Sequence, residues 1–252
     1  MLQLNRIHIN TIDSTNSCVH RLLDDGETLP DMTLVDSDDQ TAGRGQKGNS
    51  WETEPCKNLT FSLVCHPVWV HPAQQYIFSE CIALAVADSL RSFLPQDEAE
   101  KIKVKWPNDI YYADMKISGT LIECDLMGKS ISNCIVGTGV NINQRLFRSD
   151  APNPVSLCHI LNKETGREKV LMAIVGEFMR LYLQVQDGEK EAIHERYKAN
   201  LYRNDGKFYQ YSDENGSFFA RLIDVEPSGR MILETEQGET RRYEFKEVKF
   251  ML

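Results

Sequence analysis

Hydrophobic and polar residues alternate, or branched apolar residues gather in short runs, in several separated stretches of this chain. A period of two residues places successive side chains on opposite faces of an extended strand. The stretches predicted to be strands before residue 150 are 1–12, 33–36, 59–65, 101–105, 117–126 and 132–142. We expect the last two to pair as neighbours across a turn at Gly128, because strands joined by a short turn form hairpins.

Other stretches carry apolar residues at helical spacing, with three or four residues between repeats. The segments with this spacing are 14–26, 72–90, 167–186 and 189–198. Asp13 or Ser14 supplies an N-cap oxygen for the first helix, and Pro72 suits the first turn of the second. Residues 38–54 are polar and rich in glycine, so they are predicted to form a loop.

The pattern changes after about residue 201, where short alternating strands replace long helices. The strands are separated by the turn dipeptides Asp205-Gly206, Asn215-Gly216, Ser228-Gly229 and Gln237-Gly238. This spacing is typical of hairpins in a small β barrel or sandwich. A domain boundary is therefore predicted near residue 203.

Composition and charge narrow the class of protein. The 252 residues are 41% hydrophobic and 26% charged, which is ordinary for a globular protein. The formal net charge of −9 argues against a general nucleic-acid binder, which normally presents a basic face. Seven cysteines without a C-x-x-C pair indicate reduced thiols. No targeting or membrane-spanning segment is evident, so a cytoplasmic protein is predicted.

One candidate site is the glycine-rich segment at residues 43–48. It matches G-x-G-x-x-G, but the residues after it do not favour a helix, as a dinucleotide-binding fold requires. Asn49 stands where a P-loop would need its lysine, and the H-R-D and D-F-G motifs of protein kinases are absent. Two readings remain: a mobile loop whose backbone N–H groups and cations Arg44 and Lys47 bind an anion, or a solvated flexible loop.

The second candidate site begins with the block Lys105-Trp106-Pro107-Asn108-Asp109 and continues to Lys116. Pro107 restricts the turn, and a plain hairpin turn with solvated lysines remains an alternative. Glycine inside a strand often marks a bulge or a close approach of ligand. Such glycines occur here at Gly119, Gly137 and Gly139, so a flat ligand could lie on this strip of sheet.

Taken together, these segments resemble the biotin protein ligases. The matching blocks follow in the order of that family: Asp13-Ser14-Thr15-Asn16, Gln40-Thr41-Ala42-Gly43-Arg44-Gly45, Trp51, Asn58-Leu59, Lys105-Trp106-Pro107-Asn108-Asp109, Lys116 with Gly119, and Gly137-Thr138-Gly139-Val140-Asn141. The resemblance is strong over residues 6–145. It implies an α+β fold, with a mixed β-sheet catalytic domain flanked by helices at 1–202 and a small SH3-like β barrel at 203–252.

The resemblance also implies chemistry. A biotin protein ligase forms biotinyl-5′-AMP from biotin and ATP, and then transfers biotin to a lysine of a biotin carboxyl carrier protein, such as that of acetyl-CoA carboxylase. The residues that the resemblance assigns to catalysis are Lys116 and Arg44. Those assigned to biotin are Ser14, Thr15, Asn16, Gln40, Gly43, Arg44, Gly45, Lys116, Gly119 and Gly139. Those assigned to ATP are Arg44, Gln46, Lys47, Gly48, Trp51, Asn108, Asp109 and Asn141, with Asp109 also holding Mg²⁺.

Two departures from the family pattern are informative. Gln46 stands where many members carry a second arginine, so retention of the reactive adenylate is in doubt unless Lys47 substitutes. The chain also starts almost directly at the first catalytic strand, so we expect a ligase without a DNA-binding domain and without a membrane partner. A homodimer stays open. The alternatives are a lipoate–protein ligase and a non-catalytic protein that binds biotin or a nucleotide.

Overall fold

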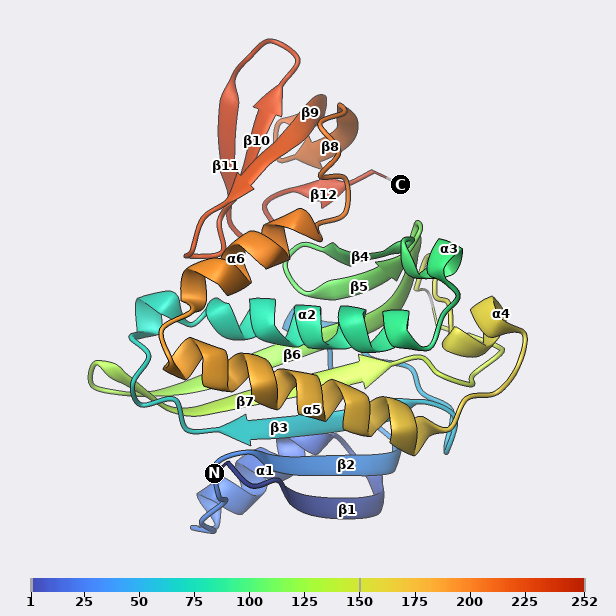
Figure 1. Cartoon of the computed structure of the whole chain (residues 1–252), viewed down its shortest axis with the longest axis vertical. Helices are drawn as coiled ribbons and strands as arrows, with labels where there is room; N and C mark the ends of the chain where they lie inside the picture. The colour runs from blue at the N-terminus through green and yellow to red at the C-terminus, as the bar shows by residue number, and fades with distance from the viewer. Residues whose placement is uncertain (1, 150, 252) are drawn as a thin grey trace.

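The computed structural model describes residues 2–149 and 151–251, and the side chain of Lys47 lies outside the described part. Within these residues the chain forms a large sheet, covered by helices, and a smaller sheet that lies above it in Figure 1. The strands of the large sheet are β1 (Asn5–Ile12), β2 (Thr33–Gln40), β3 (Leu59–Cys65), β4 (Ile102–Lys105), β5 (Asp109–Tyr112), β6 (Met115–Met127) and β7 (Ser130–Val140).

The large sheet is mixed, as the α+β prediction requires. Its strand order is β1-β2-β3-β7-β6-β5-β4, with β1 and β2 parallel and the other neighbours antiparallel. The hairpin predicted across Gly128 is confirmed, because Met127 pairs with Ser130 at its end. The interior strand β3 is buried along its whole length, which explains its continuous run of apolar and small polar residues.

Helices cover both faces of this sheet. The helices are α1 (Thr15–Asp24), α2 (Ile77–Ser92), α3 (Gln96–Ala99), α4 (Leu157–Leu161), α5 (Arg167–Gln186) and α6 (Lys190–Ala199). α2 and α5 pack against each other on one face, and α1 packs against β2, β3 and β7 on the opposite face. α2 is buried almost all round because it lies between the sheet and the helices α5 and α6.

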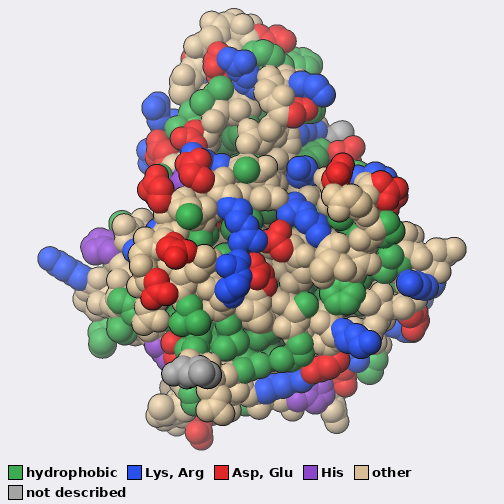
Figure 2. Space-filling model, in the orientation of Figure 1, with side chains coloured by type: hydrophobic (Ala, Val, Ile, Leu, Met, Phe, Trp, Pro, Cys, Tyr) green, Lys and Arg blue, Asp and Glu red, His purple; other side chains and the backbone are tan. Residues whose placement is uncertain are grey.

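Ion pairs connect the outer surfaces of α2, α5 and α6. Arg196 of α6 contacts both Asp88 of α2 and Glu177 of α5, and Glu177 also accepts from Arg180 at 2.6 Å. Figure 2 shows Lys and Arg side chains gathered beside acidic ones near the centre of this face. The three helices are therefore held together by charge pairs outside and apolar packing inside.

Some local predictions were wrong. β2 continues to Gln40, within the predicted loop 38–54, because its end pairs with β1 through the Ile12–Gln40 register. Pro72 does not begin α2; it lies in a separate 3-10 turn, Pro72–Gln74, and α2 begins at Ile77. The short helices α3 and α4 were not predicted, since four or five residues are too few to reveal a helical period.

The C-terminal residues form an antiparallel sheet, as the hairpin pattern predicts. Its strands are β8 (Tyr209–Asp213), β9 (Gly216–Val225), β10 (Met231–Thr235), β11 (Thr240–Tyr243) and β12 (Lys249–Phe250), in the order β11-β10-β9-β8-β12. Buried apolar residues of this sheet continue into the core beneath α2. The boundary at residue 203 remains a prediction.

Two further findings concern the class of protein. No helix in the described residues combines the length and apolar character that a membrane span requires. All seven cysteines are free thiols, five of them buried, with Cys56 exposed and Cys124 half-buried.

Candidate active site

A cavity of about 770 Å³ opens where the start of α1, the glycine-rich segment and the strands β6 and β7 meet. Segments far apart in sequence line it, including the turn at residues 107–109, residues 147, 149 and 151–154, and Phe245 from the C-terminal segment between the strands 240–243 and 249–250. Nearly all sequence-predicted site residues lie in its wall: Ser14, Thr15, Asn16, Gln40, Arg44, Gly45, Gln46, Gly48, Trp51, Asn108, Asp109, Lys116, Gly119, Gly139 and Asn141. Gly43 is not in the wall, and the side chain of Lys47 lies outside the described residues.

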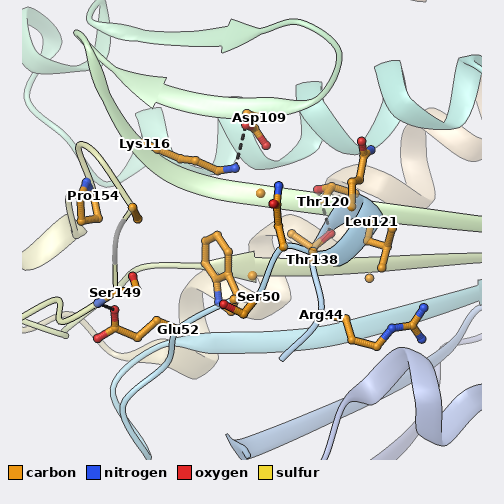
Figure 3. A pocket seen from close by; sticks show the side chains of 18 of the residues that line it. Arg44, Ser50, Glu52, Asp109, Lys116, Thr120, Leu121, Thr138, Ser149 and Pro154 are labelled. Carbon is orange, nitrogen blue, oxygen red and sulfur yellow. Dashed lines mark hydrogen bonds and ion pairs between the residues drawn. The ribbon is translucent and has the colours of Figure 1, made fainter. Parts of the chain in front are cut away.

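Lys116 points into the cavity and meets Asp109. Its Nζ lies 2.7 Å from Asp109 Oδ2, and the two side chains are 33% and 26% exposed, so the pair faces the open space (Figure 3). The backbone of Lys116 is fixed by the loop at 153–155: its N–H donates to the Asn153 carbonyl at 2.8 Å, and its carbonyl accepts from Val155 N–H at 2.9 Å. Lys116 is therefore a positioned cation beside a carboxylate.

Lys105, the first residue of the second candidate block, is not part of the cavity wall. Its Nζ donates to the hydroxyl of Tyr111 at 3.1 Å and lies over the rings of Tyr111 and Phe250. Burial lowers the pKa of Lys105 from its ordinary value. Its charge is thus shielded from the cavity by aromatic side chains.

The glycines predicted to leave a flat strip of sheet form the floor of the cavity. Gly119 of β6 lies directly opposite Gly139 of β7. The indole ring of Trp51 lies against this strip so closely that a Cβ on Gly139 would stand 2.3 Å from it. The Nε1 of Trp51 is buried and has no hydrogen-bond partner among the described residues. The strip therefore accepts a flat ring.

The polar end of the cavity is built by the start of α1 and the end of β2. Gln40 Oε1 accepts from the backbone N–H of Thr15 at 2.8 Å and from its hydroxyl at 3.0 Å. Ser62 of β3 donates to Asn16 Oδ1 at 2.6 Å and contacts the Thr15 hydroxyl at 2.8 Å. Ser62 was not predicted, because a single serine in an apolar strand carries no motif.

Glu123 of β6 connects this polar end to the glycine-rich segment. Its carboxylate accepts from Arg44 Nη2 at 2.6 Å and from Asn16 Nδ2 at 2.8 Å, and it lies 3.3 Å from His20 Nε2. Burial alone raises the pKa of Glu123, but the hydrogen bonds from Asn16 and Arg44 bring it below the ordinary value. Figure 3 shows Arg44 directed away from Lys116, so the expected common contact of these two cations with a ligand stays a prediction.

The opposite end of the cavity contains amides and backbone groups. Asn141 donates to the Val155 carbonyl at 3.1 Å, and its side-chain oxygen is buried without a partner among the described residues. Glu52, four residues after the glycine-rich segment, accepts from the backbone N–H groups of Arg148 and Ser149 and so attaches this part of the chain to residues 148 and 149. Sequence reasoning missed these residues and Phe245, since only long-range packing brings them here.

Comparisons with known proteins agree with this geometry. The model of the Biotin/lipoate A/B protein ligase family matches residues 9–141. The bifunctional ligase/repressor BirA of Bacillus spizizenii is 25% identical over 246 residues, which cover 94% of this chain and 71% of that protein. The biotin–protein ligase of Homo sapiens is 27% identical over 206 residues, which cover 79% of this chain and 28% of that protein.

Among solved structures, the biotin protein ligase from Aquifex aeolicus in complex with biotin and ATP superposes with a TM-score of 0.78 at 24% identity. The match covers 98% of this chain and 99% of the other. This similarity concerns the fold, including the small C-terminal sheet.

Proposed function

The chain belongs to the biotin/lipoate A/B protein ligase family, and on this premise we propose that it is an ATP-dependent biotin–protein ligase. It joins biotin to ATP to form biotinyl-5′-AMP and pyrophosphate, and then acylates a lysine of a biotin carboxyl carrier protein. The observation that carries the proposal is the ammonium of Lys116, which faces a cavity whose floor is the Gly119–Gly139 strip. A ring system that rests on the Trp51 indole, which covers this strip, would place its acid end near this cation.

In the first half-reaction, a carboxylate oxygen of biotin bonds to the α-phosphorus of ATP, and the bond from that phosphorus to the bridging oxygen breaks. Two anions must approach each other, so a cation between them lowers the barrier. Lys116 supplies this charge, and its contact with Asp109 holds it in place until the ligands arrive. Thr15, Asn16 and Gln40 provide donors and acceptors for the polar end of biotin, which would be costly to bury unpaired.

In the second half-reaction, the amine of the carrier lysine attacks the acyl carbon of the adenylate. The carbon–oxygen bond to phosphate breaks, the amine loses a proton and AMP leaves. Acyl adenylates hydrolyse, so the glycine-rich segment must exclude water until the carrier binds. We place the carrier on a biotin-dependent carboxylase such as acetyl-CoA carboxylase, and the reaction in the cytoplasm.

Magnesium would accompany ATP, and Asp109 is the residue that would hold it, directly or through water. No group of three Asp, Glu, His or Cys side chains in the described part of the chain is arranged to hold a metal ion. The single carboxylate of Asp109 suits magnesium, which commonly takes one or two carboxylates together with phosphate oxygens and water. When bound, the ion would neutralise negative charge on the phosphates.

The decisive experiment is incubation with biotin, ATP and a carrier domain, followed by intact mass. The expected result is a gain of one biotinyl group on the carrier, with release of pyrophosphate. Lys116→Ala should lower the rate of adenylate formation by at least about 100-fold, as for other charge-stabilising groups, and should fold normally because the side chain is 33% exposed. Lipoate in place of biotin serves as the competitor: modification by lipoate alone would reassign the substrate, and no pyrophosphate with either acid would contradict the proposal.

A further inference from the structure

The turn that carries Asn108 and Asp109 is held from behind by two tyrosines from distant helical segments. The carbonyl of Pro107 accepts a hydrogen bond from the Tyr197 hydroxyl of α6 at 2.7 Å. The hydroxyl of Tyr76, just before α2, lies 2.6 Å from the Tyr197 hydroxyl and donates to the same carbonyl at 3.4 Å. Pro107 lines the cavity, so these hydroxyls support the cavity wall from the protein interior.

The small sheet contacts the same turn. Trp106 donates its Nε1 hydrogen to the carbonyl of Gly229, in the turn between β9 and β10, at 2.8 Å. Gly229 also lies against the ring of Tyr76, so that a Cβ there would stand 2.4 Å from the ring. On the cavity side, Phe245 packs on Trp106 with ring centroids 5.8 Å apart and lines the cavity itself. One junction thus joins the two sheets and the wall of the site.

The inner part of the junction is buried. Tyr197 is 0% exposed, and Trp106 and Asn108 are 5% and 4% exposed. A buried carbonyl without a donor carries a large desolvation cost, so removal of a hydroxyl should shift the turn instead of leaving the carbonyl unpaired. A shift of this turn moves Asp109, and with it the partner of the Lys116 ammonium.

We propose that Tyr197, supported by Tyr76, is a positioning residue for the adenylate-forming half-reaction. The two hydroxyls hold the Pro107 carbonyl so that Asn108 and Asp109 face the nucleotide end of the cavity, and Gly229 holds Trp106 in the same arrangement. The small sheet thereby contributes to the ATP site indirectly, because Gly229 holds the turn that carries Asn108 and Asp109. This inference rests on the proposed function and adds residues that touch neither substrate.

The test compares Tyr197→Phe with the matched control Tyr182→Phe. Each change removes one hydroxyl from a buried helical tyrosine, but the Tyr182 hydroxyl lies 3.3 Å from Asp31, which does not line the cavity. For Tyr197→Phe we expect KM for ATP in pyrophosphate exchange to rise about tenfold, the effect of a lost partner on a buried carbonyl. The Kd for biotin, measured by calorimetry, should change less than about twofold, because the biotin end of the cavity is not contacted.

Tyr182→Phe should leave KM for ATP and Kd for biotin unchanged. Its loss of thermal stability should equal or exceed that of Tyr197→Phe. Tyr76→Phe, which loses the longer contact and keeps the ring on Gly229, should give an intermediate rise in KM for ATP, and it replaces Tyr197→Phe if the latter does not fold. Equal kinetics for the tested variant and Tyr182→Phe would overturn the positioning role. If the unchanged protein releases no pyrophosphate with biotin and ATP, the proposed function itself fails, which is a separate outcome.

Discussion

At the scale of single residues, Glu123 shows what a sequence motif leaves out. Its carboxylate binds Arg44 and Asn16, although 79 and 107 residues separate these partners from it. The glycine block and the Asp13–Asn16 block could be recognised, because their residue types and order are characteristic. A glutamate in the middle of a strand has no such mark, and only the folded sheet places it beside Asn16 and Arg44. Sequence predicted the residues that line the cavity better than the residues that hold them.

Glu123→Ala is expected to weaken biotin binding about tenfold, since Asn16 and Arg44 each lose a charged acceptor. Glu123→Gln keeps one acceptor oxygen but not the charge, so its Kd for biotin should lie between those of Glu123→Ala and the unchanged protein. Calorimetry with biotin measures both. The control is Glu177→Gln, which removes a carboxylate bound to Arg180 and Arg196 on the outer face. If it weakens biotin binding as much as Glu123→Gln, Glu123 has no special role.

At the scale of elements, periodicity predicted the long helices and strands well. It missed the short helices and the strand ends that form only by pairing with a neighbouring strand. The predicted bounds of α5 and β3 match the structure at both ends, because their apolar pattern ends where their burial ends. The end of β2 was missed because its last residues, Asp38 to Gln40, are polar and become a strand only through pairing with β1. The flat strip at Gly119 and Gly139 was foreseen, but the ring of Trp51 that lies on it was not.

Gly139→Ala tests the strip. The added Cβ would stand 2.3 Å from the ring of Trp51, so the ring must move and the floor loses its flat surface. We expect biotin affinity to fall at least about tenfold, as for other steric changes in a closely packed site, with a change in tryptophan fluorescence. Gly176→Ala in α5 is the control: nothing lies within 4 Å of its Cβ, and alanine should stabilise the helix by about 0.5–1 kcal/mol. Unchanged affinity for Gly139→Ala would contradict a ligand resting on the Trp51 ring that covers the strip.

The glycine-rich segment gives a prediction about the reactive intermediate. Gln46 lines the cavity, and a glutamine cannot neutralise a phosphate as an arginine does. Some biotinyl-5′-AMP should therefore leave the site and label lysines of unrelated proteins. With bulk albumin as acceptor, we expect label above the control without enzyme, and less label with Gln46→Arg. Label at the control level in the unchanged protein would show that the adenylate is retained.

At the scale of the whole molecule, the sequence revealed two kinds of sheet but not how they join. The junction at Trp106 and Gly229 joins residues 123 positions apart, and no local sequence pattern predicts this contact. α6 is the element that connects the parts: Tyr197 faces the turn of the active site, and Lys198 pairs with Asp224 of β9 at 3.0 Å. The stability of α6 should consequently influence how the small sheet is positioned against the cavity.

His194 of α6 and Glu80 of α2 form a buried pair, with His194 Nδ1 2.7 Å from Glu80 Oε1 and Glu80 Oε2 without a partner among the described residues. The hydrogen bond to Glu80 raises the pKa of His194, and burial raises the pKa of Glu80. Lys198 and Asp224 also face His194: the first lowers and the second raises its pKa. Both shifts mean that the folded protein binds a proton here more tightly than the unfolded chain. The stability that His194 contributes is therefore complete below about pH 6.5 and is lost as the pH rises through its higher folded pKa.

We accordingly expect the unfolding temperature to decrease as the pH rises from about 6.5 to 9, and His194→Gln to flatten this decrease, because the proton-linked difference between folded and unfolded chains is removed. Glu80→Gln should flatten it as well, since a neutral partner no longer holds the imidazolium. Thermal unfolding followed by circular dichroism over this range measures the slope. Slopes parallel to that of the unchanged protein in both variants would mean that this pair does not carry the pH dependence. A flattened slope would identify the contact between α2 and α6 as the proton-sensitive link next to the Tyr197 junction.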